Sequence, residues 1–119
     1  MRLAVAAALM LAPLAVPLAA AAQPAPGVYN LSGTNPDGSP YSGLLALADR
    51  GGGAYQVEWN LGGQKISGWG MAMGDALAAS YVLEGRIGIV IYRQQGNQWR
   101  GIWSVAGAGR GGTEMLSPR

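Results

Sequence analysis

Carboxylates, tyrosines and tryptophans are the side chains with which this chain could do chemistry, because it contains neither histidine nor cysteine. The absence of histidine removes the usual general base near neutral pH and the commonest ligand of transition metals. The absence of cysteine removes thiol nucleophiles and disulfide bonds. Classical zinc sites and Ser-His-Asp catalysis are therefore excluded, and we expect a protein that is not an enzyme and needs no cofactor.

The acidic residues do not form an evident catalytic pair. They are Asp37, Asp49, Glu58, Asp75, Glu84 and Glu114, and several stand at predicted corners, where carboxylates are usually solvated or cap turns. A glycosidase needs two carboxylates that flank a cleft, and nothing here places two of them together. Lys65, the only lysine, lies beside a predicted hairpin turn and not in a desolvated pocket.

Aromatic side chains are the candidates for ligand contacts, because they offer stacking area and a polar tip. The set comprises Tyr41, Trp59, Trp69, Trp99 and Trp103. From it we predict Tyr41, Trp69 and Trp103 as ligand-binding residues. Since the chain has no phenylalanine, the alternative is that these side chains supply the bulk of the core.

Two arginines are candidates for contacts with a partner. Arg93 and Arg100 flank a predicted turn over 94–98, so neighbouring strands could bring them together. Such a patch suits a carboxylate, a sulfated glycan or an acidic protein segment. The alternative is that both are solvated charges that discourage strand edges from aggregating.

The stretch GTNPDGSPYSG, residues 33–43, has the residue types of a metal loop or of a tight turn. Pro36 suits the second position of a type I turn, Asn35 can cap its start, and Gly38 suits the left-handed position that follows. A calcium loop would need an acidic residue near its twelfth position, where the chain has Ala46. The stretch is therefore predicted to be a turn without a metal.

The chain begins with the features of a signal peptide. Arg2 precedes an apolar run rich in Ala, Leu and Val, and small residues end it at Ala22. We expect residues 1–22 to be removed, residues 23–27 to be a flexible tether, and residues 28–119 to form one domain in the periplasm or outside the cell. A retained membrane anchor is the alternative, although Pro13 and Pro17 interrupt the run.

The rest of the chain predicts an all-β fold. In AYQVEWNL the residues Tyr55, Val57, Trp59 and Leu61 fall on one face, and a Gly62-Gly63 pair then predicts a hairpin to residues 64–71. Further strands are expected over 76–83, 86–93, 98–105 and 112–116. About eight short antiparallel strands can close into an up-and-down barrel of the lipocalin or avidin kind. A partly open barrel or a two-sheet sandwich is the alternative.

Several glycines lie inside predicted strands, where glycine weakens a sheet unless a bend or a close approach requires it. They are Gly43, Gly68, Gly88 and Gly101. We interpret them as bending points of a curved sheet, with aromatic side chains covering glycines of neighbouring strands.

The segments GVYNLSGTNPDGSPYSG, YQVEWNLGGQKISGWG, IVIYR, WRGIWS and GGTEML occur in this order along nearly the whole mature chain. They resemble small exported bacterial proteins, some of them labelled fibronectin-binding protein, that share a G-T-N-x-D-G-x-x-Y-x-G motif. Where that pattern has V-Y-R, this chain reads Val90-Ile91-Tyr92-Arg93. The resemblance implies an exported β-rich binding or adhesion module, and it assigns no functional residue.

Three functions are compatible with these features. The first is a binding module for an extracellular or cell-envelope protein or glycan, the second a carrier or sensor of a small apolar ligand inside the barrel, and the third a structural periplasmic domain. The formal net charge of +2 implies neither nucleic acid nor an anionic membrane as partner. A filled interior with an exposed sheet face would favour the first or the third function.

Overall fold

The computed structural model describes residues 23–119, which form eight β-strands. The strands are β1 (Gly27–Thr34), β2 (Pro40–Gly51), β3 (Ala54–Leu61), β4 (Gln64–Met73), β5 (Ala76–Leu83), β6 (Arg86–Gln95), β7 (Gln98–Val105) and β8 (Gly112–Pro118). The predicted signal peptide, residues 1–22, lies outside the described residues. Within residues 23–119 there is no helix of the length and apolarity needed to cross a membrane.

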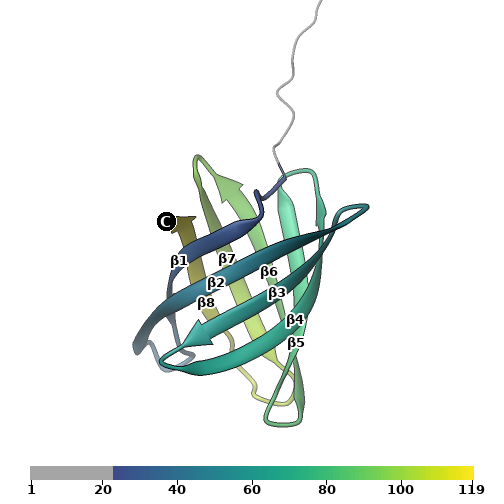
Figure 1. Cartoon of the computed structure of the whole chain (residues 1–119). Helices are drawn as coiled ribbons and strands as arrows, with labels where there is room; N and C mark the ends of the chain where they lie inside the picture. Colours follow the sequence, from purple (N-terminus) through teal and green to yellow (C-terminus); the bar gives the residue numbers. More distant parts are fainter. Residues whose placement is uncertain (1–22) are drawn as a thin grey trace, which may run out of the picture.

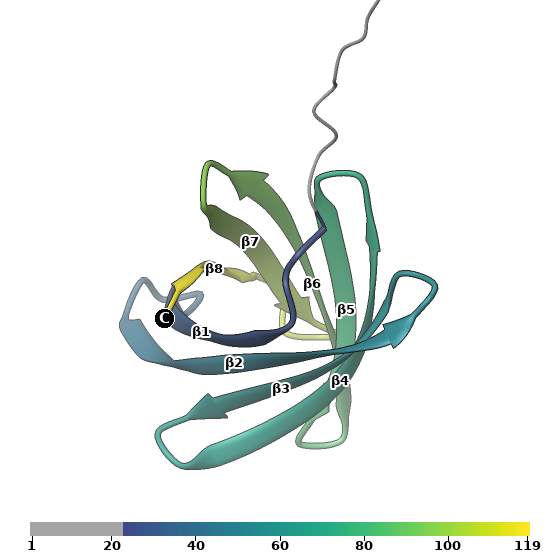
Figure 2. The same ribbon diagram turned by 45° about the horizontal axis from the view of Figure 1, so that its top comes forward.

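The eight strands form a closed antiparallel barrel in which each strand pairs with the next along the chain (Figure 1). The barrel closes because β8 also pairs with β1, from Thr34 opposite Thr113 to Tyr29 opposite Pro118. Figure 2 shows the strands following one another around the barrel, with β8 beside β1. The predicted up-and-down barrel is confirmed, and neither the sandwich nor the partly open barrel is formed.

Tight turns rich in glycine connect the strands. Gly62 and Gly63 both have positive φ, 60° and 87°, and form the predicted two-residue turn between β3 and β4. Two-residue hairpin turns with positive φ match the right-handed twist of the flanking strands. The turn after β1 is closed by a bond from Gly38 N to Asn35 O of 2.8 Å, and Asp37 Oδ1 accepts bonds from the Ser39 amide and hydroxyl. The Asp37 carboxylate is thus used within its own turn.

The inside of the barrel is a packed core, built from alternate residues of each strand. In β3 the inward set is Tyr55, Val57 and Trp59, as the alternation predicted. The largest side chains that are fully buried are Tyr55, Tyr92, Leu45, Leu77, Leu116 and Val57. The middle of the barrel is therefore filled by the chain itself.

Inside the barrel, aromatic rings lie over glycines of the neighbouring strand. Tyr41 is paired with Gly33, Tyr81 with Gly88, Tyr92 with Gly101 and Trp103 with Gly112. In each pair, a Cβ added to the glycine would collide with the ring. The prediction that aromatics cover glycines is confirmed for Gly88 and Gly101, and also for Gly68, which lies against Trp59, whereas Gly43 lies against Leu61 and not against an aromatic ring.

The expected tether is attached to one end of the barrel. The Tyr55 hydroxyl donates to Pro24 O at 2.9 Å, and the Tyr29 hydroxyl donates to Ala25 O at 2.6 Å. Pro24 is buried, and β1 already begins at Gly27. Residues 24 and 25 therefore contribute to the closure of this end of the barrel.

Candidate functional site

A buried carboxylate is the main polar feature of the barrel interior. Glu114 of β8 is 7% exposed and is the buried charged residue of the part that the structure describes. Its partners in the strand register are Gly33 on β1 and Gly101 on β7, which have no side chains. Beyond these glycines, Tyr41 and Tyr92 extend across them and reach Glu114 from both sides.

Three neutral groups donate hydrogen bonds to this carboxylate. The Tyr41 hydroxyl donates to Oε2 at 2.7 Å and the Tyr92 hydroxyl donates to Oε1 at 2.5 Å. Trp59 Nε1 lies 3.4 Å from Oε1, and 3.3 Å from the Tyr92 hydroxyl oxygen, to which it also donates. The four residues thus form one network that connects β2, β3, β6 and β8 across the barrel.

Burial dominates the acid–base properties of this network. Burial raises the pKa of Glu114. The hydrogen bonds from Tyr92, Tyr41 and Trp59 lower it, but by less than burial raises it. Burial and the nearby Glu114 charge raise the pKa values of Tyr41 and Tyr92 well above their ordinary value, and they raise the pKa of Tyr81, outside the network, to about 12. The tyrosines of the network therefore remain protonated donors at neutral pH.

An aromatic pocket of about 190 Å³ opens at the end of the barrel next to this network. Its ring walls are Tyr41, Trp59, Tyr81 and Trp103. Tyr41 and Trp103 are stacked with ring centroids 6.4 Å apart, and Trp59 and Tyr81 are 5.1 Å apart at an interplanar angle of 59°. Trp103 Nε1 is buried and makes no hydrogen bond of full strength among residues 23–119, although its N–H acts on the neighbouring Tyr41 hydroxyl. We refer to these four rings and the space between them as the aromatic pocket.

A second region with functional potential lies outside the barrel, on the outer face of β4–β7. Its exposed large hydrophobic residues are Trp69, Met71, Met73, Val82, Ile87, Ile89, Ile91 and Ile102, with exposed fractions from 43% to 81%. Soluble proteins seldom expose a contiguous apolar patch of this kind unless it binds something. We refer to this surface as the apolar face.

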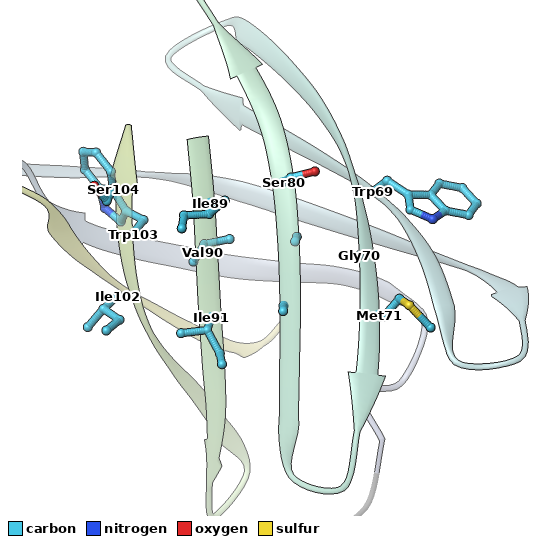
Figure 3. Close-up of a pocket in the computed structure, with 12 residues that line it drawn as sticks. Trp69, Gly70, Met71, Ser80, Ile89, Val90, Ile91, Ile102, Trp103 and Ser104 are labelled. Atoms are coloured by element: carbon cyan, nitrogen blue, oxygen red, sulfur yellow. The ribbon is translucent and has the colours of Figure 1, made fainter. Parts of the chain in front are cut away.

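The apolar face contains a groove of about 660 Å³, shown in Figure 3. Trp69 and Met71 project from β4 on one side of β5, and Ile89 and Ile91 lie on β6 on the other side. Between them β5 presents only small residues, including Ser80. The difference in size between neighbouring side chains therefore creates the groove.

Charged residues lie only at the border of this groove. Two outward rows form it, Trp69-Ser80-Ile89-Ser104 and Met71-Ala78-Ile91-Ile102, and neither contains a charge. The next row contains Arg93 paired with Arg100 across β6 and β7. Arg93 forms an ion pair with Asp75 at 2.9 Å, an exposed contact that contributes at most about 1 kcal/mol. The groove is thus apolar with a basic border.

The structure separates the predicted site residues into two groups. Tyr41 and Trp103 lie together in the aromatic pocket, whereas Trp69 is 53% exposed and points away from the barrel interior. Arg93 and Arg100 are direct neighbours, as the turn predicted. Among residues 23–119, no group of three or more potential metal ligands occurs.

Neither the buried position of Glu114 nor the groove was predicted from the sequence. The alternation of β8 was an available signal, since Glu114 occupies the same side of the strand as the buried Gly112 and Leu116. The groove had a weaker signal, because Ala78 and Ser80 are small residues on a strand whose paired neighbours are large. That pairing is visible only once the register is known.

The fold and these two regions define an eight-stranded antiparallel β barrel with a filled interior. No family model and no curated protein matches the chain. It is similar to a redesigned β barrel with a TM-score of 0.68 and 18% identity, over 79% of this chain and 90% of that chain. It is also similar to the redesigned β barrel mFAP1 bound to DFHBI, with a TM-score of 0.62 and 19% identity, over 77% of this chain and 93% of that chain. At these identities the likeness shows the fold alone.

Proposed function

We propose that this protein is an exported, non-enzymatic binding module that recognises a protein partner through the apolar face of β4–β7. The observation that carries the proposal is the groove between Trp69 and Met71 on one side and Ile89 and Ile91 on the other, in rows without any charge. Burying exposed apolar surface contributes about 25 cal/mol per Å², so a partner that covers this face gains affinity from it.

The chemistry of the groove favours a protein over a glycan. A glycan needs several hydrogen-bonding groups, and the side chains of the two central rows provide only the hydroxyls of Ser80 and Ser104 and the indole N–H of Trp69. A protein segment with a row of apolar side chains matches the small floor and large walls of the groove. Next to it, a carboxylate of the same segment can pair with Arg100 at the border.

Fibronectin is the first defined partner to test, because the chain resembles exported proteins of which some are labelled fibronectin-binding. A protein of the cell envelope is the alternative partner, in keeping with a periplasmic or secreted location. Both use the same surface in this proposal, so the site can be tested before the partner is known.

A second candidate function is the carriage of a small apolar ligand. The aromatic pocket favours it, since rings from four strands surround a space of about 190 Å³. Two solved structures similar to this fold, the redesigned β barrel mFAP1 and EF1p2_mFAP2b, are bound to DFHBI, which supports a small ligand as a use of such a barrel. The packed centre of this barrel leaves room only at its end.

The absence of cysteine permits a direct test of the protein-binding surface. A photo-crosslinker is attached to Ser80→Cys in the groove, or to Ser32→Cys on the exposed outer side of β1 as a matched control. We expect an adduct with one partner from position 80 only, and that purified partner should bind the unmodified protein. Equal adducts from both positions, or none from position 80, would contradict the proposal.

A further inference from the structure

We propose that the aromatic pocket is a binding site for a small alkylammonium ion, whose positive charge is matched by the Glu114 carboxylate behind the rings. This site is distinct from the apolar face and does not depend on the protein partner. Tyr41 and Trp59 connect the two parts, because both line the pocket and both donate hydrogen bonds to Glu114.

The buried Glu114 carboxylate has no cationic partner among residues 23–119. Glu114 receives hydrogen bonds from two hydroxyls and one indole, all of them neutral. The one ion pair found in residues 23–119 joins Arg93 to Asp75 on the outside of the barrel. A buried carboxylate without a cation loses solvation that neutral donors replace only in part. A cation in the adjacent pocket would offset this loss.

The ring walls of the aromatic pocket suit a cation. The faces of Trp and Tyr rings carry negative potential and attract alkylammonium ions, with tryptophan the strongest of the three aromatic types. Trp59, Tyr81, Trp103 and Tyr41 are arranged as two pairs of rings around one space. Leu61, Ile66 and Leu83 form the aliphatic part of the lining and suit the alkyl groups of such an ion, and Asn35 and Gln64 are its polar members.

The size of the pocket and one unused donor limit the ligand further. A volume of about 190 Å³ equals that of ~6 water molecules in the liquid, so the ion must be small. Trp103 Nε1 is buried, has only a weak interaction with the Tyr41 hydroxyl, and can donate to an oxygen atom of the ligand. An alkylammonium ion that also carries a hydroxyl group therefore meets both requirements.

A purely structural role for the Glu114 network would need neither an open pocket nor a weakly bonded indole N–H beside it. Hydrogen bonds from Tyr41 and Tyr92 already hold Glu114 and connect three strands. The open space beyond Tyr41 and the weakly bonded indole of Trp103 add nothing to that connection. Both are accounted for when the pocket receives a ligand.

The test compares choline with its neutral isostere, in which carbon replaces the nitrogen. Residues 23–119 are titrated with each compound by calorimetry, and the indole N–H signals are followed by NMR. We expect choline to bind and to shift the signals of Trp59 and Trp103, while those of Trp69 and Trp99 stay unchanged. Equal binding of the isostere, or no shift at Trp59 and Trp103, would overturn the proposal.

Variants separate the charge from the rings. Glu114→Gln should weaken choline binding about tenfold, and Tyr81→Leu, at a residue that makes no hydrogen bond to Glu114, should weaken it about fivefold. Trp69→Leu on the apolar face is the matched control and should have no effect. If Glu114→Gln does not fold, unchanged affinity in Tyr81→Leu alone would overturn the proposal. Binding to phosphatidylcholine vesicles without binding of free choline would also overturn it.

Discussion

The inner wall of the barrel and its apolar face both place large side chains next to small ones, with opposite results. Inside, Tyr92 lies over Gly101 and Tyr41 lies over Gly33, so the chain fills the space that its glycines leave. Outside, Ile91 stands beside Ala78 and nothing covers the gap, which becomes a groove of about 660 Å³.

From this difference we infer that the inner wall stabilises the fold and that the apolar face binds a second molecule. Pairs of large and small residues that fit each other within one chain produce a rigid interior, because protein cores are packed to high density. Large and small residues left unmatched on an exposed sheet leave a shape that a second molecule can fill. Substitutions of the inner glycines should therefore affect stability, whereas substitutions of the small residues on the apolar face should affect binding.

The largest expected effect on stability comes from filling the inner wall. A Cβ at Gly101 would lie 2.5 Å from Tyr92 Cδ1. Gly101→Ala must therefore displace the Tyr92 ring, whose hydroxyl is hydrogen-bonded to Glu114. We expect the free energy of unfolding, measured by urea denaturation, to fall by about 1–3 kcal/mol.

The matched change on the outer wall is Ala78→Leu. It fills open space, so the free energy of unfolding should change by no more than about 0.5 kcal/mol. Similar losses of stability in the two variants would remove the distinction between inner and outer wall.

The next prediction concerns the dependence of stability on pH. Burial raises the pKa of Glu114 above its ordinary value of 4.5, so the folded protein binds this proton more tightly than the unfolded chain. The stabilisation is complete below the unfolded pKa and is lost as pH rises through the folded pKa.

Comparison with Glu114→Gln isolates this group, because other groups titrate alike in both proteins. The stability of the wild type minus that of the variant should fall as pH rises from below 4.5 toward neutrality. Urea denaturation across this range measures it. A difference that is flat, or that rises with pH, would show that burial does not dominate at Glu114.

The smallest effect is expected from dye binding to the folded protein. An apolar fluorescent dye should bind the groove of the wild type, and Ser80→Leu should weaken this binding severalfold by filling the groove floor. Ser32→Leu on β1 is the control and should leave dye binding unchanged. If both variants behave alike, the groove is not the principal apolar surface available to ligands.

Much of the fold could be predicted from the sequence, because turn and strand signals are local. Gly62-Gly63 fixed the hairpin of β3 and β4, and the strands over 76–83 and 98–105 have the predicted bounds. The closure of the barrel could not be predicted in the same way. It depends on pairing between β1 and β8, which lie at opposite ends of the domain and share no turn.

The candidate sites were predictable only in part. In β6, both sides of the strand are apolar, so the pattern alone could not decide that Ile89 and Ile91 are exposed while Val90 is buried. Tyr41 and Trp103 could be selected as large aromatics in a small barrel. Glu114 resembles any other isolated carboxylate until the register places it between two glycines.

The most direct test of the proposed function compares two lysine substitutions on opposite sides of the barrel. Ile91 on the apolar face is 43% exposed and Val28 on β1 is 44% exposed, so Ile91→Lys and Val28→Lys disturb the fold to a similar degree. Affinity is measured for the partner captured through position 80. We predict that Ile91→Lys weakens binding at least tenfold and that Val28→Lys leaves it unchanged. Equal affinities of the two variants would contradict the assignment of the apolar face as the binding surface.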